Sequence, residues 1–361
     1  MTQPLRSRVR GARALILLCG AIAIGPGAGI SGVARGADVF QLSSDESNAL
    51  FDKAKASVVQ VRSGNPGTIR NGGSGFFIDT QGTVLTSSDI LDDSTSACVV
   101  VNGVEMDAKI LCNDSFSGLA MLRVGYGASP ALPLAHAAGL QSGDGVIAIG
   151  YPLNLPAAPS QGPVSGFDAN YLAPLDTQLE PKRALAQLIR FATTHIHANV
   201  AISPGEIGGP LLNSHGEVVG LIAATPDYGR SIYALPVEAL NKVLADFGRF
   251  GHVRYGRVGI NVIEDRRDSA HDGRTVHVVG VMPGTPAAES GIRTGDTVMR
   301  IDAREIHRLA DVQDASFFSQ VGGNVNVVVR RDDRLFNYSF AVIESGATPV
   351  KSHIADSPAG K

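Results

Sequence analysis

The stretch Ser203-Pro204-Gly205-Glu206-Ile207-Gly208-Gly209-Pro210-Leu211-Leu212 decides what this chain can fold into and what it can do. Its three glycines let the backbone turn sharply, so that one side chain and two or three N–H groups converge on one point. The residue at the centre of the turn is Ile207, which has no hydroxyl and cannot attack a carbonyl. The stretch therefore predicts a tight loop that presents Ile207 among converging backbone N–H groups.

Seven other segments stand around this loop in a fixed order along the chain. They are Ala56–Val61, Gly73–Asp79, Gly82–Leu91, Gly118–Val124, Val146–Pro152, Gly216–Leu221 and Ile232–Pro236. Together with the loop, they resemble the protease domain of the HtrA/Deg family over roughly residues 45–245. The resemblance implies a mostly β fold, a trypsin-like double β-barrel.

The resemblance also implies where the three catalytic residues would lie. Asp89 stands at the histidine of the family run T-N-N-H-V-V, which here reads Thr86-Ser87-Ser88-Asp89-Ile90-Leu91. Gly118 stands at the aspartate of D-L-A-V-L-K-I, and Ile207 stands at the serine. A carboxylate with an ordinary pKa is a poor general base, and here it has no hydroxyl to activate. We therefore expect no serine-protease turnover.

Two features near the loop leave other chemistry open. The N–H groups of Gly205 and Ile207 could still form an oxyanion hole, which alone supports about a thousandfold rate over water. His195 and His197 share one face of a predicted strand, either as a metal pair or as a polar face lining the empty cleft. Because no third ligand is placed beside them, the sequence predicts no metal site and no cofactor.

A second resemblance begins after the barrels. Gly280–Val298 resembles the long pattern V-x-P-G-S-P-A-A-x-A-G-L-x-x-G-D-x-I of HtrA-type PDZ domains, an α+β fold. Arg257-Val258-Gly259-Ile260 stands at the carboxylate-binding loop, which implies capture of extended or C-terminal peptides by strand addition. Val258 and Ile260 would line a pocket for an apolar terminal residue. Arg257 would either attract the carboxylate or remain solvated.

The domain plan follows from composition and from the N-terminus. Residues 1–37 read as a signal peptide, with four arginines before the apolar run Ala14–Ile24 and small residues at the cleavage site. The protease-like domain is predicted over 38–247, a linker and PDZ domain over 248–345, and a disordered tail over 346–361. Helices are predicted over 236–247 and 312–320, and an exposed loop over 264–274. The protein is expected to be periplasmic or secreted, with membrane anchoring only if the leader stays uncleaved.

Charge and cysteine use restrict the partners. The formal charge is −3, and it becomes −8 without the leader, which holds five arginines and no acid, so nucleic acid is not an expected partner.

Cys98 and Cys112 either form a disulfide or stay unlinked. The turn signal Asn102-Gly103 would pair position 98 with about 107 rather than 112, which disfavours the bond.

Three functions are compatible with these residues. The leading hypothesis is a catalytically inactive HtrA-like envelope protein that binds unfolded or C-terminal peptide segments as a holdase, adaptor or scaffold. The second is a regulatory subunit that co-assembles with an active relative, since the family implies trimers joined through aromatic residues. Phe40 and Phe51 would serve there, or else belong to the core. The third is a hydrolase with an unfamiliar site that uses His195 or His197.

Overall fold

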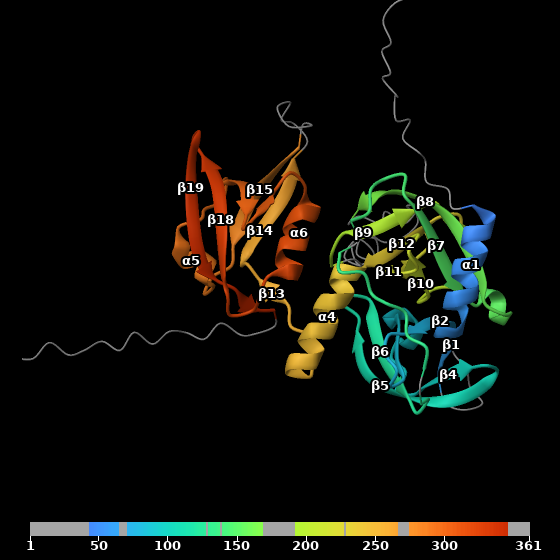
Figure 1. Cartoon of the computed structure of the whole chain (residues 1–361). Coiled ribbons are helices and arrows are strands. Elements are labelled where there is room, and N and C mark those ends of the chain that lie inside the picture. The colour runs from blue at the N-terminus through green and yellow to red at the C-terminus, as the bar shows by residue number, and fades with distance from the viewer. Residues whose placement is uncertain are drawn as a thin grey trace, which may run out of the picture. The chain divides into compact units, whose positions relative to one another are not determined.

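The computed structural model describes residues 43–64, 71–127, 129–137, 139–168, 192–226, 229–265 and 274–345. It consists of two closed six-stranded barrels and a third, smaller domain built on a six-stranded sheet (Figure 1). The mostly β fold class and the trypsin-like double barrel predicted from the sequence are confirmed. The predicted leader, Phe40, the C-terminal tail and most of the insert 264–274 lie outside the described residues.

The first barrel closes in the order β1-β2-β3-β6-β5-β4, with β4 paired back onto β1. Its elements are α1 (Ser44–Ala54), β1 (Val58–Ser63), β2 (Asn71–Phe77), β3 (Thr83–Ser87), α2 (Ser88–Leu91), β4 (Ala97–Val101), β5 (Val104–Asp114) and β6 (Leu119–Val124). Apolar side chains such as Phe77, Val84 and Leu122 are wholly buried inside it. Burial of that apolar surface is the main force that holds the barrel closed.

The hairpin between β4 and β5 has the predicted register. Asn102 and Gly103 both have positive φ, 50° and 79°, as a two-residue hairpin turn of the primed type requires. The turn pairs Cys98 with Asp107. Cys98 and Cys112 are therefore on different rungs of the ladder, and both thiols are free.

The second barrel closes in the order β10-β11-β12-β9-β8-β7. Its strands are β7 (Gly145–Gly150), β8 (Ala158–Asp168), β9 (His195–Ala198), β10 (Pro210–Leu212), β11 (Val218–Ala224) and β12 (Ile232–Pro236). Every residue of β10 is buried. The glycine-rich loop 203–209 leads directly into this strand, so its C-terminal end is held by a fully packed element.

The third domain follows helix α4 (Val237–Phe250). Its elements are β13 (Gly256–Arg257), β14 (Ile260–Asp265), β15 (Thr275–Val281), α5 (Pro286–Ser290), β16 (Thr297–Ile301), β17 (Arg304–Glu305), α6 (Leu309–Phe318), β18 (Asn324–Arg331), β19 (Arg334–Ala341) and β20 (Ile343–Glu344). The main sheet runs in the order β14-β15-β16-β18-β19, so β14 is an end strand. Gly291 ends α5 in the left-handed conformation, at φ 99°, as expected from the sequence.

Two predicted helix boundaries are wrong. Helix α4 continues through Gly248 to Phe250, because the left-handed cap is Gly251, at φ 75°. Helix α6 begins at Leu309 and ends at Phe318, not over 312–320. The Asp311 carboxylate accepts the backbone N–H groups of His307 and Arg308, at 2.9 and 2.8 Å. It therefore caps the helix from inside its first turn rather than preceding it.

In the part of the chain that the structure describes, no helix has the length and apolar character needed to cross a membrane.

Candidate functional site

The loop 203–209 is fixed by backbone hydrogen bonds to both barrels. The N–H of Ser74 in β2 donates to the Ile207 carbonyl at 2.8 Å, and the N–H of Gly208 donates to the Ile222 carbonyl in β11 at 2.8 Å. The Ser74 hydroxyl donates to the Gly205 carbonyl at 2.7 Å and accepts the Tyr151 N–H at 2.9 Å. These hydrogen bonds join the loop to both barrels.

Two glycines of this loop occupy positions where no other residue fits. Gly205 has φ 100°, and a Cβ there would lie 2.4 Å from the Tyr151 carbonyl oxygen. Gly208 has φ 85°, and its Cβ would lie 2.2 Å from the Ser74 carbonyl oxygen. Left-handed backbone and close approach together explain why the sequence needs glycine at both positions.

The three positions that the family resemblance assigns to the triad, Asp89, Gly118 and Ile207, lie on segments that touch one another. The N–H of Ser88, just before Asp89, donates to the Gly118 carbonyl at 2.9 Å. On the other side of α2, Ile90 approaches the junction with the loop. A Cβ added to Gly73 would lie 2.2 Å from Ile90 Cδ1 and 2.8 Å from the Ile207 carbonyl oxygen.

The side chains at these positions carry none of the groups that acyl transfer needs. Asp89 is exposed on the first turn of α2. Gly118 has φ 83° and faces open space, since a Cβ there would meet no atom within 4 Å. Ile207 is partly buried and packs against the core of the second barrel. No imidazole and no hydroxyl therefore stands at the base or nucleophile position.

The backbone donors of the loop remain available. Among the described residues, no acceptor takes the N–H of Gly205 or of Ile207. Two such donors can bind a carbonyl oxygen of an extended peptide.

Glu206 is a feature of the loop that sequence reasoning missed. Its side chain is 2% exposed, one carboxylate oxygen accepts the Ser203 N–H, and the other has no partner among the described residues. Burial raises the pKa of this carboxyl, and the Ser203 N–H offsets part of that effect. The only sequence signal was an acidic residue inside a glycine-rich loop.

The two histidines of β9 have separate structural partners. His195 is buried, and its Nδ1 lies 2.8 Å from the Thr193 carbonyl oxygen. Burial lowers its pKa to about 4, so the ring is neutral at physiological pH. His197 Nε2 lies 3.2 Å from the Ser231 hydroxyl, and its ring stacks on Tyr233 at 4.7 Å. Across the described ranges, no three His, Cys, Asp or Glu side chains gather where a metal ion would bind.

The predicted carboxylate loop of the third domain leads into the end strand β14. Val258 is buried, and Ile260 packs partly against the same core. Gly259 has φ 85°, and a Cβ there would lie 2.7 Å from the Thr285 hydroxyl. Among the described residues, the N–H groups of Val258 and Gly259 have no acceptor. Arg257 lies 3.4 Å from the Ser345 hydroxyl.

Helix α6 flanks this strand. At the far end of β14, the Glu264 carboxylate accepts the N–H of Leu309, the first residue of α6, at 3.0 Å. A free strand edge beside a helix, with unused N–H groups at one end, is the geometry that accepts a peptide as an added strand.

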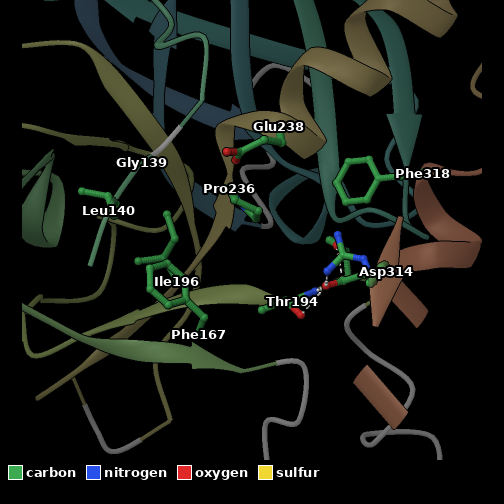
Figure 2. A pocket seen from close by; sticks show the side chains of 11 residues that line it. Gly139, Leu140, Phe167, Thr194, Ile196, Pro236, Glu238, Asp314 and Phe318 are labelled. Atoms are coloured by element: carbon green, nitrogen blue, oxygen red, sulfur yellow. Dashed lines mark hydrogen bonds and ion pairs between the residues drawn. The ribbon is translucent and has the colours of Figure 1, made fainter. Parts of the chain in front are cut away.

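A cavity of about 520 Å³ lies on another side of α6, and Figure 2 shows its lining. Apolar side chains from the second barrel form one wall, and Phe318 stands opposite. Asp314 accepts the Thr193 hydroxyl and the Thr194 N–H, both at 2.7 Å, and the Thr194 hydroxyl at 2.8 Å. Arg304 lies 3.3 Å from the same carboxylate. No sequence pattern predicted this network, because Asp314 is simply an acidic residue within a helix.

Comparison with known proteins agrees with this architecture. Residues 73–221 match the family described as trypsin-like peptidase domain, and residues 256–342 match the PDZ domain family. Fold and sequence thus define a trypsin-like double barrel followed by a PDZ domain. With these two domains in this order, the chain is similar to serine endoproteases of the HtrA/Deg type.

Curated relatives carry protease names. The chain is 27% identical over 277 residues to the "Putative serine protease HhoB" of Synechocystis, matching 73% of this chain and 64% of that one. It is 27% identical to "Serine endoprotease DegS" of Escherichia coli K12, over 85% of this chain and 89% of DegS. A "Probable periplasmic serine endoprotease DegP-like" of Hahella chejuensis is 28% identical, over 82% of this chain. The chain spans 61–64% of the length of the Synechocystis and Hahella relatives.

Solved structures show the same fold. "HtrA-type protease AlgW with tripeptide" superposes with a TM-score of 0.66 at 22% identity, over 83% of this chain and 98% of that one. The serine endoprotease from Yersinia pestis gives 0.60 at 23% identity, over 84% of this chain and the whole of that one.

Proposed function

We propose that this chain is a catalytically inactive HtrA-like protein of the cell envelope that binds unfolded or C-terminal peptide segments. The observation that carries the proposal is the set of side chains at Asp89, Gly118 and Ile207, on three segments in mutual contact. Loss of a catalytic triad lowers turnover by about a million-fold, because its members act as a unit. The protease names of the relatives describe those proteins and not this chain.

The peptide-binding half of the proposal rests on the end strand β14 and the loop before it. Unused N–H groups at Val258 and Gly259 suit a terminal carboxylate, and the apolar neighbours suit an apolar last residue. The titles of the AlgW structures describe that protein with a tripeptide and with a decapeptide. The same mode of binding is the simplest use of this domain here.

The envelope location is proposed from the leader and from the periplasmic names of relatives. Holdase, adaptor and scaffold remain the possible roles of such a binder. Co-assembly with an active relative is the second candidate. Of the aromatic residues considered for it, Phe51 is partly buried against the core of its own chain, which does not single it out as a subunit contact.

The test is binding of a fluorescent decapeptide with an apolar last residue, followed by fluorescence anisotropy. The matched control is the same peptide with its C-terminus amidated, which removes the carboxylate without changing any side chain. We expect the amide to bind at least tenfold more weakly, and mass spectrometry to recover the peptide intact. Equal affinity of the two peptides would contradict capture at the 257–260 loop.

The variant Arg257→Gln separates the two roles considered for that side chain. Weaker binding of the acid but not of the amide would mean that Arg257 attracts the carboxylate. Unchanged binding of both peptides would mean that Arg257 is solvated and that the backbone N–H groups bind the carboxylate.

A further inference from the structure

The carboxyl group of Glu206 is enclosed at the centre of the loop that joins the two barrels. The residue is 2% exposed, yet only one of its two carboxylate oxygens has a hydrogen-bond donor among the described residues. Gly150 has no side chain, and this leaves room for Glu206. A Cβ on Gly150 would lie 2.8–2.9 Å from the Cα, Cβ and Cγ atoms of Glu206. A buried carboxylate with a single N–H partner is poorly compensated.

The loop is folded around this side chain. The Ser203 N–H donates to the Glu206 carboxyl, and the Glu206 N–H returns to the Ser203 carbonyl at 3.2 Å. The Gly209 N–H then donates to the Glu206 carbonyl at 3.1 Å. The conformation of residues 203–209 therefore depends on where the Glu206 carboxyl sits.

The turn 152–155, which contains strained backbone, is hydrogen-bonded to the loop 203–209. The Leu153 N–H donates to the Pro204 carbonyl at 2.7 Å. Leu153 and Asn154 both have positive φ, 49° and 62°, which for side-chain-bearing residues persists only where surrounding contacts impose it. Leu153 is also 62% exposed, so its own side chain supplies little of that support. Release of the Pro204 carbonyl would thus loosen residues 152–155 as well.

The surroundings of Glu206 supply little that could compensate an ionised carboxylate. Ser74 from β2, Gly150 from β7 and Asn154 from the adjoining turn carry no charge. Tyr151 is the titratable group in these elements, and its hydroxyl donates to the Val58 carbonyl at 3.2 Å. Burial raises the pKa of Tyr151 above its ordinary value of 10, so it stays neutral from pH 4 to 8.

We propose that Glu206 is a pH-sensitive lock, whose neutral carboxyl holds the loop 203–209 and the attached turn 152–155 closed and whose ionisation opens both. This inference goes beyond the proposed peptide binding and does not depend on it. The proton is exchanged with solvent, and no bond other than O–H changes.

The sign of the effect follows from linkage. In the closed loop, burial raises the pKa of Glu206 above its ordinary value of 4.5. Below pH 4.5 both the closed and the open states are protonated, and the closed state keeps its full stability. As pH rises, the open state loses its proton first, so the closed state loses stability until the pH passes the raised pKa. Each unit by which the pKa of Glu206 in the closed state exceeds its pKa in the open state changes the closed-to-open ratio tenfold.

Hydrogen–deuterium exchange of the full chain between pH 4 and 8 tests the lock. Protection is the intrinsic exchange rate at each pH divided by the measured exchange rate. The amides of Ser203 and Leu153 are the reporters. In the wild type their protection should fall as pH rises, tenfold for each unit by which the pKa exceeds 4.5. In Glu206→Gln, an uncharged near-isostere, protection should be independent of pH.

Glu217→Gln is the matched control, because Glu217 is a carboxylate shortly after the same loop whose partner is the Asn213 amide, at 3.0 Å. It should retain the pH dependence of the wild type. Constant or rising protection in the wild type, or an equal fall in Glu206→Gln, would overturn the proposal. If Glu206→Gln does not fold, carbon-13 NMR titration of the wild-type Glu206 carboxyl decides: a pKa above 4.5 supports the lock, and one at or below 4.5 contradicts it.

Discussion

Asp296 and Arg331 form a two-pronged ion pair in the PDZ domain, and it shows how a single pair sets acid sensitivity. Arg331 Nε and Nη2 lie 2.6 and 2.7 Å from the two carboxylate oxygens, and Asp296 is 1% exposed. Burial alone would raise the pKa of Asp296. The hydrogen bonds from Arg331 and from the Arg293 N–H outweigh that effect and hold the pKa below its ordinary value of 3.8.

The expected consequence is a stability difference that disappears in acid. A carboxyl whose pKa is lowered by folding stabilises the fold above its unfolded pKa of 3.8, and this stabilisation is lost as pH falls through the lower folded pKa. Asp296→Asn should therefore unfold at lower urea than the wild type at pH 7. The two curves should converge as pH drops below 3.8. A gap that stays constant down to pH 2 would show that the charge of Asp296 is not the cause.

Two glycines with nearly equal φ allow the cost of left-handed backbone to be measured apart from the cost of steric crowding. Gly208 and Gly118 have φ 85° and 83°, but an added Cβ meets the Ser74 carbonyl at 2.2 Å in the first and nothing within 4 Å in the second. Gly118→Ala should lower the free energy of unfolding by about 1–2 kcal/mol, the cost of left-handed backbone. Gly208→Ala should lose about 1–3 kcal/mol more through overpacking. Urea unfolding of both variants checks this, and equal losses would contradict the crowded geometry of the loop.

At the scale of elements, helix α6 has three distinct attachments. Its first turn is bonded to β14 through Glu264, Val312 packs into the core of the PDZ domain, and Asp314 binds Thr193 and Thr194. The strand edge and the helix therefore cannot shift independently. A peptide added to β14 would be bound beside a helix that is already held in place.

Asp314→Ala removes one of these attachments and leaves its donors without an acceptor. Asp314 is 5% exposed and accepts three hydrogen bonds from Thr193 and Thr194, so we expect a loss of about 2–4 kcal/mol in unfolding free energy. Asp311→Ala is the comparison, since it removes only a helix cap, worth about 1 kcal/mol. Equal losses in the two variants would mean that the Thr193–Thr194 contacts contribute nothing.

Local signals predicted some of these elements, and long-range packing decided the others. The Asn102-Gly103 turn fixes its register by its own backbone preference, so the pairing of Cys98 opposite Asp107 could be predicted. The start of α6 could not, because the pattern does not show that Asp311 caps the helix from within. Glu206 and Asp314 are buried by segments that lie more than 50 residues away in the sequence. A local sequence pattern contains no information about such contacts.

At the scale of the whole molecule, we propose that the trypsin-like fold stands without the three side chains of a catalytic triad. The two barrels are held by their buried apolar cores, to which a base, an orienter and a nucleophile contribute little. The loop 203–209 persists because Ser74, Ile222 and its own glycines fix it. On the proposed assignment of Asp89, Gly118 and Ile207, a trypsin-like fold without a triad would thus be stable.

Turnover of fluorescently labelled unfolded casein tests the central claim most directly. The wild type would be compared with the triple variant Asp89→His, Gly118→Asp, Ile207→Ser, in which the open space at Gly118 gives the aspartate room. The account predicts no turnover by the wild type while casein is still retained, and turnover by the triple variant if the backbone geometry is intact. Casein cleavage by the wild type that survives purification to constant specific activity would contradict the account.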